Sequence, residues 1–181
     1  KAAKAIFAAK KPFIILGYYP SWDHAGPELE EFINLTQIPF NTRRLGRAAV
    51  SEKHPLHHRG FPKFRNEFDL MLPIGLKVGF FDGYAGGWPE SVQIAPCEEY
   101  VWTYINTKAS LVGNTKVVMK QLNECIKKNG YDKISPERKE WAERCKKSME
   151  DGTTARTAQA YKYGPDHPRY KSNNILHFGY L

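Results

Sequence analysis

Cysteine is scarce in this 181-residue sequence, and no long hydrophobic run is present. The three cysteines, Cys97, Cys125 and Cys145, form no Cys-x-x-Cys pair, which argues against a disulfide framework or a zinc site. A reducing cytoplasm is the expected location. No apolar stretch approaches the roughly 20 residues that a membrane-spanning helix needs. Hydrophobic residues make up 41% of the chain, so the composition predicts one soluble globular domain with a hydrophobic core.

Motifs of catalysis and phosphate binding are also missing. The sequence has no nucleophile elbow, and its nearest approach to a Gly-x-Gly-x-x-Gly motif, residues 83–87, does not run from a predicted strand into a helix. His54, His57 and His58 lie together without nearby Cys or Asp partners, whereas metal-binding histidines need partners at defined spacing. We therefore predict no metal site and interpret these histidines as surface or interface residues.

Positive charge is in excess, with 27 Lys and Arg against 19 Asp and Glu and a formal net charge of +8. Such an excess is compatible with nucleic-acid binding, which would weaken steeply with salt. The basic residues are interleaved with glutamates, however, as in residues 137–147. This pattern is more typical of a solvated helix face with i,i+4 pairs, so nucleic acid is the weaker prediction.

Helix and strand signals alternate along the chain, which predicts an α/β fold with a parallel sheet. Short apolar segments closed by Gly, Pro or polar residues are typical of buried parallel strands. The predicted strands are 13–16, 38–42, 69–75, 91–95 and 109–113. Helices are predicted at 2–10, 28–36 and 115–128, and from Pro136 onward. The segments 18–26, 43–68 and 76–89 are expected as loops, the second with room for a helical turn.

The predicted helix 115–128 has an N-cap residue in Asn114. Its apolar side is expected to carry Val118, Leu122, Cys125 and Ile126. The last helix has Ser135 as its N-cap and proline at the first position. From Asp151 the chain is polar and free of strand signals, a composition typical of a linker, until an apolar pattern resumes at 175–181.

Five segments, in order along the chain, resemble the middle domain of thiamine-diphosphate-dependent enzymes related to acetolactate synthase, oxalyl-CoA decarboxylase and 2-hydroxyacyl-CoA lyase. Residues 46–56 (GRAAVSEKHPL) are the most specific match, being similar to that family's connection after its second strand. The other matching segments are 10–17, 27–40, 69–75 and 112–122.

This resemblance implies a Rossmann-like parallel sheet of six strands with helices on both faces, of the NAD/FAD-binding domain type. Residues 1–150 would be the central domain and 151–181 a linker toward a missing C-terminal thiamine-diphosphate-binding domain. The parent enzyme would be an oligomer, a dimer or tetramer, that uses thiamine diphosphate and Mg²⁺ on 2-oxo acids or acyl-CoA. Its activating glutamate and diphosphate–Mg²⁺ motif would lie outside this chain, in flanking domains, and the fragment would be catalytically silent.

Some relatives are expected to bind FAD or ADP in this domain, and the sequence departs from them at three places. Residues 92–98 (VQIAPCE) lack the acid that follows the fourth strand and holds an adenosine ribose. Residues 43–46 (RRLG) replace the family's TPMG, and 60–69 is too short for the usual helix. A bound nucleotide is therefore not the favoured prediction.

Ligands of open α/β sheets bind at the carboxyl ends of the strands. The candidate cofactor-binding residues at that edge are Gly17, Tyr18, Arg43, Arg44, Gly75 and Lys77. Basic side chains near helix N-termini could bind a phosphate of ADP, FAD or CoA, which would make the chain a stand-alone nucleotide-binding module. Alternatively, the glycines only permit tight turns, and the arginines face solvent or a neighbouring domain. Both hypotheses stay open, and residues 80–88, rich in aromatics, are expected to line an interface or pocket.

Overall fold

The structure, a computed structural model, describes residues 1–59, 61, 64–77, 89–102, 105–131 and 133–162. Only the backbone is described for residues 44–45 and 153–162. The chain divides into two compact units, residues 1–146 and 147–181. The sheet and the candidate site belong to the first unit. The aromatic stretch 80–88 and the apolar stretch 175–181 lie outside the described residues.

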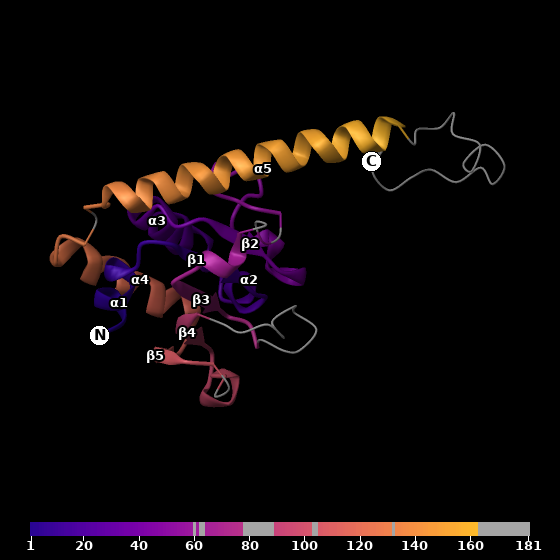
Figure 1. The fold of residues 1–181 in the computed structure, drawn as a ribbon. Helices are drawn as coiled ribbons and strands as arrows, with labels where there is room; N and C mark the ends of the chain where they lie inside the picture. Colours follow the sequence, from indigo (N-terminus) through magenta and orange to yellow (C-terminus); the bar gives the residue numbers. More distant parts are fainter. Residues whose placement is uncertain (60, 62–63, 78–88, 103–104, 132, 163–181) are drawn as a thin grey trace. The chain divides into compact units, whose positions relative to one another are not determined.

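A parallel sheet of five strands forms the centre of the first unit, with the order β2-β1-β3-β4-β5 (Figure 1). The strands are β1 (Pro12–Leu16), β2 (Phe40–Thr42), β3 (Leu70–Ile74), β4 (Glu90–Ala95) and β5 (Thr107–Val112). All five predicted strands are confirmed within a few residues. Because β1 lies between β2 and β3, the direction of strand succession reverses between β1 and β3.

The sixth strand implied by the family resemblance is reduced, among the described residues, to a single parallel bridge between Phe40 and His57. The Phe40 amide donates to the Leu56 carbonyl at 3.0 Å, and the His58 amide donates to the Phe40 carbonyl at 2.7 Å. If this bridge is counted as a strand beside β2, the order becomes the 3-2-1-4-5-6 of dinucleotide-binding sheets. The described part of the chain therefore forms a sheet of five strands rather than six.

The same bridge shows that His57 and His58, which the sequence predicts to be surface or interface residues, do not lie on the surface. His57 is only 5% exposed and His58 only 9% exposed, because the backbone bonds to Phe40 draw both into the edge of the sheet. Their rings pack against aromatic neighbours, His57 at 5.2 Å from Phe40 and His58 at 6.5 Å from Phe13. Burial lowers the pKa of His57 and favours its neutral form.

The helices are α1 (Ala2–Ala8), α2 (Tyr19–Trp22), α3 (Gly26–Thr36), α4 (Thr115–Lys128) and α5 (Pro136–Lys162), with 3₁₀ turns η1 (Arg44–Ala48), η2 (Arg65–Glu67) and η4 (Glu98–Tyr100). Helix α2 lies in a segment that the sequence predicted as loop. Helix α5 extends to Lys162, so part of the predicted linker is helical. The domain boundary near residue 150 stays a prediction. None of the described helices is both long and apolar enough to cross a membrane.

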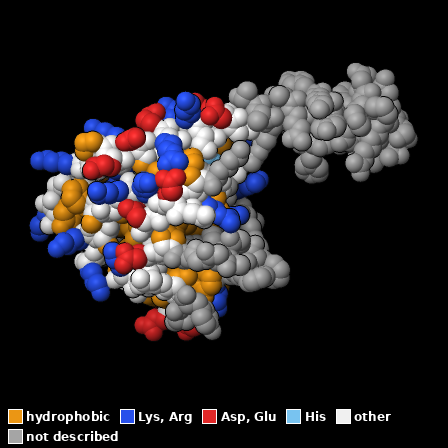
Figure 2. Space-filling view, in the orientation of Figure 1, with side chains coloured by type: hydrophobic (Ala, Val, Ile, Leu, Met, Phe, Trp, Pro, Cys, Tyr) orange, Lys and Arg blue, Asp and Glu red, His pale blue; other side chains and the backbone are white. Residues whose placement is uncertain are grey.

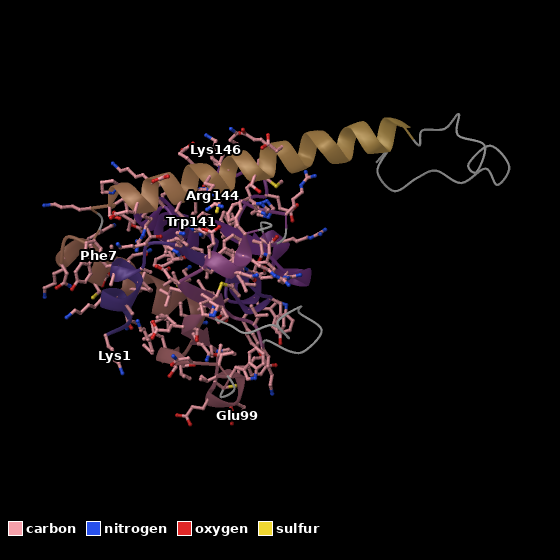
Figure 3. All side chains as sticks on the ribbon, in the orientation of Figure 1. Lys1, Phe7, Glu99, Trp141, Arg144 and Lys146 are labelled. Atoms are coloured by element: carbon pink, nitrogen blue, oxygen red, sulfur yellow. The ribbon has the colours of Figure 1, made fainter. Side chains whose placement is uncertain are left out.

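Both faces of the central strands β1 and β3 are buried, as in a Rossmann-like fold, whereas the edge strand β5 alternates between half-buried and exposed residues. Ile14 and Leu16 share one apolar cluster with residues of α1, α3 and α4. Phe13 and Ile15 point to the opposite face, where Trp141 from α5 completes a second cluster. The indole nitrogen of Trp141 also donates to the Pro12 carbonyl at 3.0 Å, and Figure 3 shows this side chain reaching from α5 toward the strands.

Helix α4 begins where predicted, with the Asn114 side chain accepting from the Val117 amide at 3.3 Å. Its buried face differs from the expectation at one position, since Cys125 is exposed. Asn123 is buried instead, because its amide donates to the Glu28 carbonyl at 2.8 Å and to the Glu31 carboxylate at 2.9 Å, so this polar side chain has partners inside the α3–α4 contact.

Candidate functional site

The loops that follow β1, β2 and β3 meet at the carboxyl edge of the sheet. This places Gly17 and Tyr18 after β1, Arg43 and Arg44 after β2, and Gly75 and Lys77 after β3. The edge therefore gathers all six candidate residues, as predicted. The side chain of Arg44 lies outside the described part of the chain.

The glycines of this edge are in backbone-to-backbone contact. A Cβ atom on Gly17 would overlap the Gly75 carbonyl and the Leu76 side chain, and one on Gly46 would overlap the Gly17 carbonyl. Gly75 has a φ of +64°, in the left-handed region that favours glycine, and a Cβ there would overlap Pro20. The space beside these glycines is thus filled by the protein itself, which supports the tight-turn hypothesis.

An aromatic cluster covers the end of β1 and reaches the 3₁₀ turn after β4. The Tyr18 hydroxyl donates to the Tyr100 hydroxyl at 3.2 Å, and the Tyr19 ring packs edge-on to Tyr100 at 5.2 Å. Trp22 lies 5.2 Å from Tyr18 and 5.3 Å from Tyr19, with 60% of its surface exposed. A hydrogen bond with the Tyr100 hydroxyl raises the pKa of Tyr19 to about 12, so the Tyr19 phenol is uncharged at neutral pH.

The two described cations of the candidate site lie over different aromatic rings. The Arg43 guanidinium is 5.1 Å from the centre of Phe61, and the Lys77 ammonium is 5.7 Å from the centre of Tyr100. The Nε atom of Arg43 is buried and has no hydrogen-bond partner. Asn41, two residues before it on β2, is 1% exposed, and neither atom of its amide has a partner. The cations thus do not share one anion-binding position among the described residues.

Comparison with known proteins identifies the fold's family. The profile described as "Thiamine pyrophosphate enzyme, central domain" matches residues 1–122. The chain belongs to this family of central domains. The match covers all five strands and the first half of α4, so the resemblance noted in the sequence is confirmed.

Several proteins similar to this chain are enzymes about three times its length. Human 2-hydroxyacyl-CoA lyase 1 is 25% identical over 148 residues, which cover 77% of this chain and 25% of the lyase. A probable acetolactate synthase large subunit of Methanococcus aeolicus is 28% identical over 138 residues, covering 67% of this chain and 22% of the subunit. A solved structure described as a thiamin diphosphate-dependent enzyme, from Mycobacterium smegmatis, has a TM-score of 0.55 and 22% identity, covering 67% of this chain and 26% of its own. The chain thus spans about a quarter of these proteins.

Strand β4 ends at Ala95, and the family resemblance implies an acid after this strand in relatives that bind FAD or ADP. Ala95 is 3% exposed, and its carbonyl accepts from the Gly113 amide at 2.9 Å. The next acids are Glu98 and Glu99 on η4, and Figure 3 shows Glu99 projecting away from the strands. No described carboxylate therefore lies at the end of this strand.

The N-terminus of α4 is occupied by carboxylate and amide oxygens of the same chain. Asp23, which follows α2, accepts a hydrogen bond from the Thr115 amide at 2.6 Å. Sequence reasoning missed both Asp23 and Tyr100, because their partners are 92 and 82 residues away and no local pattern marks them. The Asn114 cap was the one part of this arrangement with a local signal.

An open depression of about 380 Å³ lies between α2, α3 and η1. Pro20, His24 and Glu30 are among its lining residues, whereas none of the six candidate residues lines it. The depression is therefore separate from the edge between β1 and β3.

The described residues also lack the ligands for the diphosphate and Mg²⁺ that the family implies for a parent enzyme. Among them, no group of three or more His, Cys, Asp or Glu side chains is placed to hold a metal ion. Magnesium binds through oxygen ligands, mostly carboxylates and phosphates, and this domain does not bring such carboxylates together. The residues present do not fit the group, so no catalytic step is assigned to this chain.

Proposed function

We propose that this chain is the central scaffold domain of a thiamine-diphosphate- and Mg²⁺-dependent carboligase or decarboxylase, and that the chain alone is catalytically silent. The match of residues 1–122 to the central-domain profile carries the proposal. The sheet supports it, because helices of the same chain bury both faces of its central strands β1 and β3.

A substrate of the 2-oxo acid or acyl-CoA class is the second part of the proposal. It rests on the names of the relatives, which include acetolactate synthase and 2-hydroxyacyl-CoA lyase. Oxalyl-CoA decarboxylase of Escherichia coli is also similar, with 27% identity over 94 residues, which cover 51% of this chain and 17% of the decarboxylase.

For the six edge residues we propose contact with a flanking thiamine-diphosphate-binding domain or a second subunit rather than with a phosphate. The position of Arg43 and Lys77 over different aromatic rings favours this role, as does the exposure of Trp22, which packs against Tyr18. The parent enzyme is proposed to be a cytoplasmic homo-oligomer, with residues 151–181 linking this domain to the next. A nucleic-acid partner is disfavoured, because basic and acidic side chains are interspersed over the face shown in Figure 2.

The purified 181-residue chain, mixed with thiamine diphosphate, Mg²⁺ and either pyruvate or oxalyl-CoA, is expected to show no turnover above the rate of the buffer. Turnover at enzyme-like rates, about 1 s⁻¹ or more, would refute the scaffold role. The reading frame that contains this chain provides the positive test. It is expected to encode a Gly-Asp-Gly…Asn motif downstream and a glutamate-bearing domain upstream, and a frame without either motif would contradict the proposal.

A further inference from the structure

We propose that this domain seals the crevice at the switch point of its sheet with its own side chains and binds neither FAD nor ADP there. The sealing contacts are those between Tyr18 and Tyr100 and between Asp23 and Thr115. The proposal concerns this domain's own residues and does not depend on the reaction of the parent enzyme.

The floor of the crevice is closed by backbone contacts. In open α/β sheets the ligand crevice lies outside the carboxyl ends of the two strands between which the order reverses, here β1 and β3. The Gly17 amide donates across this point to the Ile74 carbonyl at 2.9 Å, and the Tyr19 amide donates to the Gly75 carbonyl at 3.2 Å. The segment after β1 therefore folds directly onto the end of β3.

The phenol side chains close the crevice above this floor. Tyr100 comes from η4, after β4, and meets Tyr18 and Tyr19 from the segment after β1. The contact therefore joins the half of the sheet that contains β2 and β1 to the half that contains β3, β4 and β5. An adenine or flavin ring placed between these halves would have to displace the tyrosines.

The positions that usually hold a pyrophosphate are also unsuitable. The first turn of α3, the long helix after β1, contains Pro27, which has no N–H, and Glu28, which is negatively charged. At α4, the other helix N-terminus of this edge, the Thr115 amide already donates to the Asp23 carboxylate. A phosphate would meet a like charge at both helix ends. Strand β4 ends at Ala95, so the acid that the family resemblance implies after this strand in FAD- or ADP-binding relatives is not present there.

Ligand binding provides the first test. The thermal midpoint of the 181-residue chain, followed by circular dichroism, is expected to change by less than about 1 °C with 1 mM FAD or 1 mM ADP, whereas a site with a dissociation constant of about 10 µM would raise it by roughly 5–10 °C. Isothermal titration is expected to give no saturable heat with either ligand. A saturable one-to-one isotherm with FAD or ADP would overturn the proposal.

A double-mutant cycle tests the seal itself without removing a ring. Tyr18→Phe and Tyr100→Phe are each expected to raise the unfolding equilibrium constant about 2- to 10-fold, and the double variant by less than the product of the two, because both remove the bond between these hydroxyls, whereas Tyr100→Phe also removes the bond to Tyr19. Tyr131→Phe, which alters a tyrosine stacked on Phe7 away from the crevice, is the matched control and is expected to change little. Additive effects of Tyr18→Phe and Tyr100→Phe would show that the two hydroxyls do not interact, and would refute the seal.

Discussion

Replacing Arg138 by methionine is expected to destabilise the domain through the loss of one buried cap. Arg138 lies in the first turn of α5 and is 2% exposed. Its guanidinium donates to the carbonyls of Ile6, Phe7 and Ala9, at 2.9 Å for Phe7, and so satisfies the C-terminal end of α1. Methionine keeps most of the apolar stem and removes only the donors and the charge.

The expected cost follows from which carbonyls water can reach after the change. The carbonyl of Ile6 stays buried and loses its donor, which costs about 1–3 kcal/mol. Phe7 is 38% exposed, so water replaces the donor at that end of the helix. Loss of the cation from the helix C-terminus adds about 0.3–1 kcal/mol. Relief of the desolvation that lowers the pKa of Arg138 offsets part of this, and the net loss is about 2 kcal/mol.

Urea unfolding, followed by tryptophan fluorescence and by circular dichroism, measures this loss. The midpoint is expected to fall while the slope m stays unchanged, and the thermal midpoint is expected to fall by about 4–8 °C. Arg138→Lys is the matched variant, because it keeps the positive charge but not the planar guanidinium with its several donors. An intermediate loss of stability is expected. An Arg138→Met protein as stable as the parent would refute the capping argument.

Three further changes follow from single contacts. Arg144 and Lys11 lower the pKa of Glu67 from 4.5 to about 2, so the stabilisation that this carboxylate gives is complete above pH 4.5 and is lost as the pH falls toward 2. Glu67→Gln is expected to make the urea midpoint depend less on pH over this range. An unchanged pH profile would contradict this assignment. Asn41→Leu is expected to stabilise the domain by about 1–2 kcal/mol in the same assay, because it removes a buried amide without partners, and a loss of stability would indicate a partner for that amide. Burial raises the pKa of the Cys145 thiol to about 12. Ellman's reagent is therefore expected to modify the exposed Cys125 in the folded chain and Cys145 only in denaturant. Equal rates of modification of the two cysteines in the folded chain would argue against this burial.

The sequence predicted the features whose signals are local. Apolar runs closed by glycine gave the strands, and Asn114 and Ser135 marked the starts of α4 and α5. The segment 18–26 was predicted as loop, but it contains α2, where the Asp23 amide donates to the Tyr19 carbonyl at 2.8 Å. That helix is four residues long, too short for a periodic pattern.

The errors concern contacts between segments that are distant along the chain. Cys125 was expected to face the core because its apolar character fits the helix period, yet Asn123 takes that side, since Glu28 and Glu31 supply partners from α3. Likewise, burial of His57 depends on a β-bridge to Phe40, and the loop-like sequence around His57 contains no signal that predicts this bridge. At the candidate site, the positions of the predicted strand ends identified the residues at the carboxyl edge of the sheet. They did not identify Tyr100 or Asp23, whose side chains bond to other segments across this edge.

Because Arg138 and Trp141 contact the N-terminal part of the domain, their contacts can form only late in the synthesis of the chain. Arg138 bonds Ala9 and Trp141 bonds Pro12, each across 129 residues. At about 5–20 residues per second, a ribosome needs roughly 6–26 s to make the intervening chain. During that interval the end of α1 has no guanidinium donor and the apolar face of β1 lacks its indole cover. The nascent domain is therefore expected to need protection from aggregation until the first turn of α5 has emerged.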